Sequence, residues 1–362
     1  MPLTLRAAVG TAIREAPATD AKNRPASPVD YSHLASSGGV LRPLQVLTMP
    51  TLGQLPRAAL ATRARPLPNR EGATTSRRFA PLGPWQPVRL LGRGRKTIVF
   101  QARPIHAPPT APADYVIKAL DPDFDDDSLA LAALKREALV AGSVTHPNLP
   151  VLLASQLQRQ PCHLAFLHER AVSGRRLLIA GGADDEVQGL KIPRALRIVR
   201  QAADALRALH EAGWLHGDVK PDNLLVAPDG KTTLIDLGFT RRLEDEECAC
   251  SEALSGSCIY TAPEMIVPSD PLTAASDIYS LGITLFELLT GSPPMETRDR
   301  ATVVSWHLRS VAPELRERLP HAPLRLARLL RAMLARQPLR RPSLAELLPW
   351  LMELEIETLA MQ

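Results

Sequence analysis

Cysteines and long apolar runs are scarce in this chain of 362 residues. Four cysteines are too few for a disulfide framework at this size, and the Cys248-Ala-Cys250 spacing lacks the second pair that a zinc site needs. No apolar run approaches the roughly 20 residues of a membrane helix, and residues 1–20 contain no stretch typical of a secretory signal. These absences predict a protein of a reducing compartment, the cytoplasm, without a membrane span.

Acidic residues are scarce only at the N-terminus. Residues 1–80 contain 11 Lys and Arg against 4 Asp and Glu, whereas the remaining 282 residues contain 32 against 34. The excess of positive charge therefore belongs to the N-terminal segment and not to the body of the protein. A slightly acidic body argues against nucleic-acid binding, while a basic tail is suited to an acidic partner.

The N-terminal segment also lacks the residues that build a core. Residues 1–80 hold nine prolines and only two aromatic residues, Tyr31 and Phe79, with no persistent helical or strand period. Such a segment buries too little apolar surface to offset its ordering entropy, so we expect residues 1–83 to be mostly disordered. Strand patterns begin near Pro84, and helical patterns dominate from about residue 190. This order predicts an α+β protein with two lobes.

A glycine-rich turn opens the ordered part. The stretch LLGRGRKTIVF contains Gly92 and Gly94, with Thr97 in place of a third glycine and Val99 after it. Glycines let backbone N–H groups approach phosphate oxygens. Because β-branched residues follow, the stretch continues as a strand and does not open a dinucleotide-binding helix. An ordinary hairpin turn remains the alternative for this motif alone.

A lysine and a glutamate follow on the next two elements. Lys118 lies in the strand pattern YVIKAL, and Glu137 lies in the helical stretch SLALAALKREALVAGSV. If Glu137 reaches back to Lys118, the ammonium is held where it can contact the phosphates of a nucleotide. For each residue taken alone an alternative remains. Lys118 could extend to solvent, and Glu137 could lie on a solvated helix face.

The stretch LHGDVKPDNLLV carries the densest group of polar residues. Asp218 can orient or deprotonate an incoming hydroxyl, and Lys220 can neutralise a transferring phosphoryl group. Asn223 and Asp236 lie at the two ends of a predicted hairpin with PDG as its turn. Their hard oxygen atoms, brought together in this way, predict a Mg²⁺ site. A polar turn between a helix and a strand is the alternative for the first stretch alone.

Taken in this order, the motifs resemble those of the protein kinases. The resemblance covers residues 84–358 and implies a bilobal fold, with a small strand-rich lobe over about 84–170 and a larger helical lobe over about 171–358. It implies that ATP and Mg²⁺, for which Mn²⁺ could substitute, bind between the lobes. The residues that it assigns to nucleotide, metal and catalysis are Gly92, Gly94, Val99, Lys118, Glu137, Asp218, Lys220, Asn223 and Asp236.

Aminoglycoside- and choline-type kinases also use HGD followed by Asn and Asp, so a small-molecule phosphotransferase is the first alternative. Three later features favour a protein kinase: SGSCIYTAPEM at 255–265, ASDIYSLGITLFELLTG at 275–291, and Arg341. The resemblance implies that Asp277 holds the backbone of the catalytic loop and that Arg341 pairs with Glu264. A non-enzymatic pseudokinase scaffold is the second alternative, which the complete set of chemical groups disfavours.

The resemblance implies a bacterial eukaryotic-like Ser/Thr protein kinase. Lys220 favours Ser/Thr over Tyr specificity. The acceptors are expected to be proteins, with the chain itself among them, since TTSRR at 74–78 offers three hydroxyls beside two arginines. Glu169 to Val172 are expected near the adenine.

The chain departs from the family pattern at Gly217, where many protein kinases have the arginine that receives an activation-loop phosphate. The loop itself carries four acidic residues at 244–247. We therefore predict activity without a phosphate switch in this loop. Cys248, Cys250 and Cys258 in the same segment are expected to be incidental small apolar residues, with a redox-sensitive loop as the alternative.

Overall fold

The computed structural model describes residues 79–180, 189–243, 258–267, 272–295, 297 and 299–360, which belong to one compact unit. The expected disorder of residues 1–83 therefore concerns positions that lie almost entirely outside this part of the chain. Within it, no helix is both long enough and apolar enough to span a membrane.

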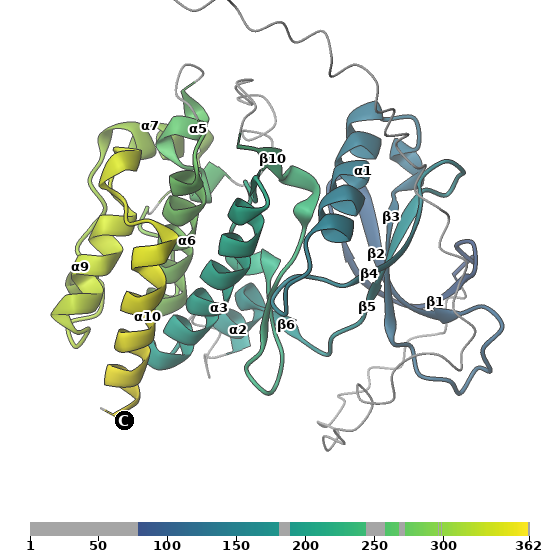
Figure 1. The fold of residues 1–362 in the computed structure, drawn as a ribbon, viewed down its shortest axis with the longest axis horizontal. Helices are drawn as coiled ribbons and strands as arrows, with labels where there is room; N and C mark the ends of the chain where they lie inside the picture. Colours follow the sequence, from purple (N-terminus) through teal and green to yellow (C-terminus); the bar gives the residue numbers. More distant parts are fainter. Residues whose placement is uncertain are drawn as a thin grey trace, which may run out of the picture. The chain divides into compact units, whose positions relative to one another are not determined.

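An antiparallel sheet of five strands builds the small lobe (Figure 1). The glycine-rich turn joins the first two strands, and the strand order is β1-β2-β3-β5-β4. The predicted strands on both sides of this turn and around Lys118 are confirmed. The strands are β1 Trp85–Arg93, β2 Thr97–Pro104, β3 Tyr115–Leu120, β4 Leu152–Gln156 and β5 His163–Leu167.

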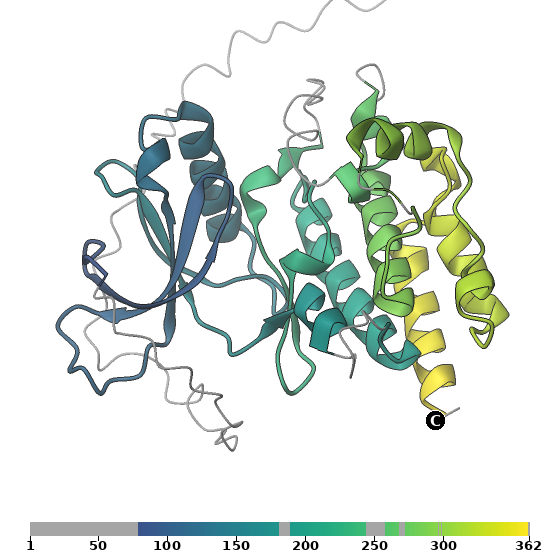
Figure 2. The same cartoon turned by 180° about the vertical axis from the view of Figure 1, so that it is seen from behind.

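Helix α1, Ser128–Ser143, lies against one face of this sheet (Figures 1 and 2). The Asp127 side chain caps its N-terminus by accepting from the backbone N–H groups of Leu129 and Ala130. Side chains alternate along β3, so Ile117 packs with Trp85 in one cluster while Leu120 packs with α1 in another. Lys118 is two residues from Leu120, and the alternation therefore directs it toward α1.

The large lobe is built around α6, Ala274–Thr290, whose residues 276–289 are all buried. Helix α3, Ile192–Glu211, is amphipathic and packs between α6 and α10 (Figure 1). The predicted dominance of helices after about residue 190 is confirmed, as is the bilobal α+β fold. Further α-helices in the described residues are α2 Gly174–Ala180, α5 Pro263–Ile266, α7 Arg300–Arg309, α8 Leu315–Arg318, α9 Leu324–Met333 and α10 Leu344–Leu359.

Short strands lie on the side of the large lobe that faces the small lobe (Figure 2). The predicted hairpin is formed by β8 Leu224–Val226 and β9 Thr232–Leu234, and β6 Val172–Ser173 pairs with β8. A second pair consists of β7 Trp214–Leu215 and β10 Arg241–Arg242. The loop that contains the predicted residues Asp218, Lys220 and Asn223 runs from β7 to β8, so both strand pairs hold it in place.

Candidate active site

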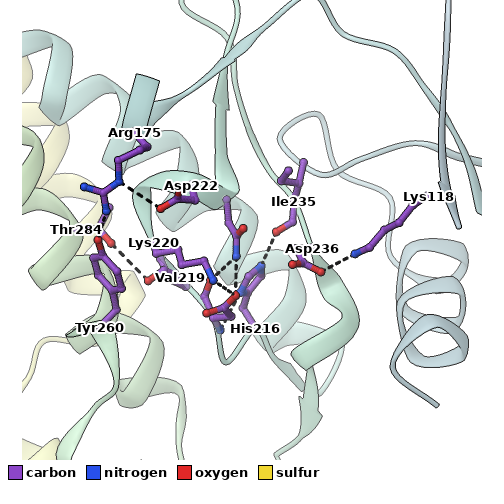
Figure 3. Close-up of polar contacts among 12 residues, drawn as sticks. Lys118, Arg175, His216, Val219, Lys220, Asp222, Ile235, Asp236, Tyr260 and Thr284 are labelled. Carbon is purple, nitrogen blue, oxygen red and sulfur yellow. Dashed lines mark hydrogen bonds and ion pairs between the residues drawn. The ribbon is translucent and has the colours of Figure 1, made fainter. Parts of the chain in front are cut away.

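Lys118 joins the two lobes through two carboxylates. Its Nζ atom lies 2.6 Å from Glu137 Oε2 on α1 and 2.7 Å from Asp236 Oδ1 after β9. Figure 3 shows the ammonium group directed at Asp236. The predicted pair of Lys118 and Glu137 is therefore present, and Asp236 completes a three-residue cluster.

Burial and charge act in opposite directions within this cluster. Burial lowers the pKa of the Lys118 ammonium, but the carboxylates of Asp236 and Glu137 outweigh it and hold that pKa above the ordinary value. Burial raises the pKa of Asp236, but Lys118, together with Lys220 and His216, outweighs burial, so this pKa stays below its ordinary value. The pKa of Glu137 is raised, because burial and the nearby Asp236 carboxylate together outweigh Lys118. Lys118 and Asp236 therefore form the firmly ionised pair.

Asp236 has an unusual backbone conformation. Its φ of 70° and ψ of 68° lie in the left-handed region, where aspartate is among the few non-glycine residues that are tolerated. The following turn, Leu237–Phe239, packs against α1, and Leu237 is fully buried. Arg136 on α1 donates from Nη1 to the carbonyl oxygen of Gly238 at 3.1 Å. The strained position is thus followed by a turn that is held against α1.

The catalytic loop brings three predicted residues together. Asp218 Oδ2 accepts from Lys220 Nζ at 2.6 Å and from Asn223 Nδ2 at 2.9 Å. Asn223 Nδ2 also donates to the Asp218 carbonyl oxygen at 2.8 Å. Burial raises the pKa of Asp218, and Lys220 offsets part of that increase. The side chain can therefore accept a hydrogen bond from a hydroxyl while held in a fixed orientation.

Asp277 on α6 holds the backbone of this loop in place. Its carboxylate accepts from the backbone N–H groups of His216 at 2.8 Å and Gly217 at 2.9 Å, and His210 Nε2 lies 2.8 Å away. Gly217 has a φ of +75°, and a Cβ atom there would lie 2.9 Å from the carbonyl oxygen of Phe239. The predicted role of Asp277 as a support of the loop is confirmed by these contacts.

The glycine-rich turn forms the far end of β1 and the beginning of β2. Gly92 pairs with Val99 in the sheet, and the backbone N–H of Gly94 donates to the Thr97 carbonyl oxygen at 2.8 Å. A Cβ atom at Gly94 would lie 2.8 Å from the Thr97 hydroxyl oxygen, whereas one at Gly92 would meet nothing within 4 Å. Thr97, in place of a third glycine, therefore closes this turn against Gly94.

A buried ion pair between Arg341 and Glu264 supports the large lobe. Arg341 Nη1 lies 2.6 Å from Glu264 Oε1 and Nη2 lies 2.9 Å from Oε2, so the predicted pair is present and bidentate. Both side chains are at most 2% exposed. Ser276 also donates to Glu264 at 2.7 Å, and the remaining guanidinium donors bond to backbone carbonyls of Ala275, Ala335 and Arg336.

The linker between the lobes consists of residues 168–171, between β5 and β6. The carboxylate of Glu169 is turned toward the β8–β9 hairpin, where it accepts from Lys231 Nζ and from the Thr233 hydroxyl, both at 2.5 Å. The Glu169 side chain thus ties the linker to the large lobe. Its expected position near the adenine stays a prediction.

The donor atoms fit a divalent cation of the Mg²⁺ type. Ile235 donates from its backbone N–H to the Asn223 carbonyl oxygen at 2.9 Å, which brings Asn223 beside Asp236. The Asn223 amide nitrogen is engaged by Asp218, so its oxygen is left for another partner, and the Asp236 side chain is 29% exposed. No group of three His, Cys, Asp or Glu suited to a metal occurs in the described ranges. Mg²⁺ commonly takes one or two protein ligands and completes its shell with phosphates and water.

Several contacts were not predicted from the sequence. Arg136 was not singled out, although it directly precedes Glu137. Arg175 on α2 contacts Asp222, Tyr260 and Glu287. Nothing in the local pattern around Arg175 indicates those partners, because they come from three other segments. Cys258 is a buried free thiol, whereas Cys248, Cys250 and the acidic residues 244–247 lie outside the described residues.

Comparison with known families gives one match over most of the chain. The family model described as "Protein kinase domain" matches residues 85–351. This range contains every residue that the sequence assigned to nucleotide, metal and catalysis.

Individual relatives point the same way. The chain is 33% identical to Serine/threonine-protein kinase PknH of Mycobacterium bovis over 243 residues, which are 67% of this chain and 39% of that protein. It is 32% identical to PknD of Mycobacterium tuberculosis over 264 residues, 72% of this chain and 38% of that protein. For PknE of the same organism the identity is 31% over 270 residues, 74% of this chain and 45% of that protein. The chain thus spans less than half the length of these relatives.

Solved structures share the fold. Two mutant forms of the PknI kinase domain from Mycobacterium tuberculosis superpose with a TM-score of 0.57, at 23% and 22% identity. They cover 78% and 80% of this chain, and 99% and 100% of their own chains are matched.

Proposed function

The chain belongs to the protein kinase family, and from this premise we propose that it is a bacterial Ser/Thr protein kinase. It transfers the γ-phosphate of ATP to Ser or Thr hydroxyls of proteins, itself among them. The observation that carries the proposal is the Lys118, Glu137 and Asp236 cluster placed beside the Asp218 loop, within a chain whose family match spans residues 85–351.

The family uses ATP and a divalent cation, and we assign the contacts to both. Lys118 binds the α and β phosphates, while the turn at Gly92 and Gly94, with Val99, lies over the nucleotide. Asn223 and Asp236 would hold the cation, which we propose to be Mg²⁺ or Mn²⁺. When bound, it neutralises charge on the phosphates.

The chain's own residues account for the positioning of the acceptor. Asp218 accepts a hydrogen bond from the acceptor hydroxyl and orients its oxygen toward the phosphorus. Lys220, whose ammonium is 2.6 Å from Asp218, neutralises negative charge on the transferring group. Little covalent chemistry is asked of the protein, because phosphoryl transfer depends mainly on positioning and electrostatics.

The buried pair of Glu264 and Arg341 supports a protein acceptor over a small molecule. It ties the segment that ends in A-P-E to the body of the large lobe. That segment is the platform for a peptide in protein kinases, and the aminoglycoside- and choline-type kinases lack this set of residues. A protein acceptor is therefore the better-supported substrate class.

We further propose that activity does not depend on a phosphate in the activation loop. Gly217 has no side chain to receive one. In its place, side chains of the chain itself hold α1 against the catalytic centre, through Glu137 with Lys118 and Arg136 with the Gly238 carbonyl. Acidic residues 244–247, outside the described residues, bring negative charge to the same loop.

Transfer of labelled γ-phosphate tests the function. Label is expected on Ser or Thr of the protein itself or of a generic basic protein, and it should vanish in Asp218→Asn and Asp236→Asn. Labelling of aminoglycosides or choline without protein labelling would instead support the small-molecule alternative. ATP binding without any turnover would support the scaffold alternative.

The absence of a phosphate switch needs a separate test. Ser251, Ser255 and Ser257 are replaced together by Ala. Activity within about threefold of the unaltered chain is expected, because a threefold change is less than about 1 kcal/mol. Loss of nearly all activity in this variant would overturn the proposal for regulation, but not the proposed enzyme activity.

A further inference from the structure

Arg175 is the centre of a polar cluster beside the catalytic loop. It lies in the first turn of α2 and donates from Nη1 to Glu287 Oε1 and from Nη2 to the Tyr260 hydroxyl. Its Nε atom lies 3.4 Å from Asp222 Oδ2. The Tyr260 hydroxyl in turn donates to Glu287 Oε2 at 2.6 Å. Figure 3 shows Arg175 beside Asp222 and Tyr260, on the side of the loop away from Lys118.

The cluster has a buried end and an open end. The Glu287 side chain, near the C-terminus of α6, is 1% exposed, whereas that of Asp222 is 50% exposed. A buried carboxylate requires a cation or several donors, because an unpaired buried charge is costly. Arg175, itself 28% exposed, supplies the cation and extends from the buried carboxylate to the exposed one.

Asp222 places the cluster next to the acceptor. It directly precedes Asn223, whose amide nitrogen is 2.9 Å from Asp218 Oδ2. The Thr284 hydroxyl on α6, which donates to the Ser280 carbonyl oxygen at 2.8 Å, lies 3.5 Å from the Val219 carbonyl oxygen, so the helix of Glu287 lies against the same loop. An extended acceptor chain advances about 3.3 Å per residue, so residues that flank a serine at Asp218 pass within reach of Asp222.

We infer that Arg175 determines acceptor specificity by occupying the carboxylates of Glu287 and Asp222 from within the chain. A basic residue of the acceptor would otherwise be the natural partner of these two carboxylates. With Arg175 in place, the enzyme accepts serines and threonines without a flanking arginine or lysine. The inference rests on the proposed protein kinase activity and deepens it by naming a determinant of the substrate class.

A purely structural role for Arg175 predicts a different result. If the guanidinium only joined α2, α6 and Tyr260, its loss would lower stability and reduce activity toward all acceptors by the same factor. If Arg175 keeps the two carboxylates from binding a basic residue of the acceptor, its loss changes the ratio between acceptors. The ratio of kcat/KM values is therefore the decisive readout.

The experiment uses serine peptides in which one arginine moves along the positions that flank the acceptor. Matched peptides carry citrulline, a neutral residue of nearly the same shape, in place of the arginine. The full chain is expected to show an arginine-to-citrulline ratio within about threefold at every position. In Arg175→Met the ratio should rise about tenfold or more at one or two neighbouring positions, because two carboxylates lose their cation.

Arg176→Met is the matched control. Its side chain is exposed on the same turn of α2, and removing this charge should leave every ratio unchanged. The double variant with Arg175→Met and Glu287→Gln should lose most of the gain, since the buried carboxylate is then neutral.

Two results would overturn the inference whether or not Arg175→Met folds. One is a tenfold or larger preference of the unaltered chain for arginine at any position, because the carboxylates would then bind substrate despite Arg175. The other is an unchanged ratio in Arg175→Lys, which keeps a cation for Glu287 but lacks the fork to extend to Asp222. Phosphorylation without these shifts refutes only the role of Arg175, whereas no phosphorylation of any protein or peptide refutes the proposed function itself.

Discussion

Two charge clusters in this protein each pair a basic side chain with carboxylates, but they differ in how far the carboxylates are exposed to solvent. Glu264 and Arg341 in the large lobe are at most 2% exposed. All three guanidinium nitrogens of Arg341 donate hydrogen bonds, either to the Glu264 carboxylate or to backbone carbonyl oxygens. Lys118 also has two carboxylate partners, but Asp236 in that cluster is 29% exposed. The closed cluster stabilises the fold, and the open one is available to a ligand.

The comparison also explains why buried charge alone does not identify a catalytic residue. A fully satisfied ion pair has no remaining affinity for another partner, and breaking it leaves an uncompensated charge in the core. A cluster with an accessible carboxylate can exchange partners when a ligand arrives. The two clusters should therefore respond in opposite ways to mutation, one in stability and the other in activity.

The largest effect is expected for Asp236→Asn. Asparagine tolerates the left-handed backbone, and Lys118 keeps Glu137 as a partner, so the free energy of unfolding should change by no more than about 1 kcal/mol. Phosphate transfer should fall about 10³-fold, because the carboxylate that we propose as a ligand of the cation is lost. Steady-state kinetics and urea unfolding of the same samples check both. Asp126→Asn, an exposed charge, is the control, and a large loss of stability in Asp236→Asn would remove the contrast between the clusters.

Arg341→Met should act on stability instead. Removal of one partner leaves Glu264 buried without its cation, so the free energy of unfolding should fall by about 3–5 kcal/mol. Urea unfolding measures the change. The double variant that also carries Glu264→Gln should recover most of it, because no charge then remains unpaired. A stable Arg341→Met variant that lacks activity would place this pair in the catalytic centre after all.

A pH effect of intermediate size is expected from His307. This buried side chain lies between the Tyr279 hydroxyl, 2.9 Å from Nδ1, and the Cys258 carbonyl oxygen, 3.0 Å from Nε2. Burial lowers the pKa of His307 to about 4. In the unfolded chain the pKa of this histidine is about 6.5. As the pH falls from 6.5 toward 4, the unfolded state therefore binds a proton that the folded state does not bind.

Stability that depends on neutral His307 is complete above pH 6.5 and is lost progressively as the pH falls toward 4, by about 3 kcal/mol in total. His307→Gln has no titrating group and should lack this part of the pH dependence. Unfolding by urea at several pH values measures it, and parallel curves for the two proteins would contradict the assignment.

The smallest effect is expected for Gly217→Ala. The φ of +75° disfavours any side chain by about 1–2 kcal/mol, and the new Cβ atom would press on the Phe239 carbonyl oxygen. Stability should fall by that amount, and phosphate transfer should decline about tenfold as the loop shifts. Gly142→Ala on α1 is the control, since its Cβ would meet no atom within 4 Å and should leave stability equal or higher. If Gly217→Ala were as stable as the unaltered chain, the loop would accommodate the side chain at no cost in free energy, and the prediction would be wrong.

Prediction from the sequence succeeded where neighbours along the chain determine structure. The strands beside Gly92 and Gly94 and the helix over Glu137 follow from local period. Two tertiary pairs were also predicted, Lys118 with Glu137 and Glu264 with Arg341. They were accessible because the ordered motifs resemble a family in which the pairs occur, and not because the local pattern contains them.

What the sequence by itself determined is therefore the set of chemical groups, their order and the elements that carry them. Only the tertiary structure decided that Arg136 bonds to the Gly238 carbonyl, that Glu169 turns toward Lys231 and that Arg175 occupies Glu287 and Asp222. Each of these contacts joins side chains from separate elements. Long flexible side chains have many rotamers and several candidate partners, and the packing of the elements selects among them.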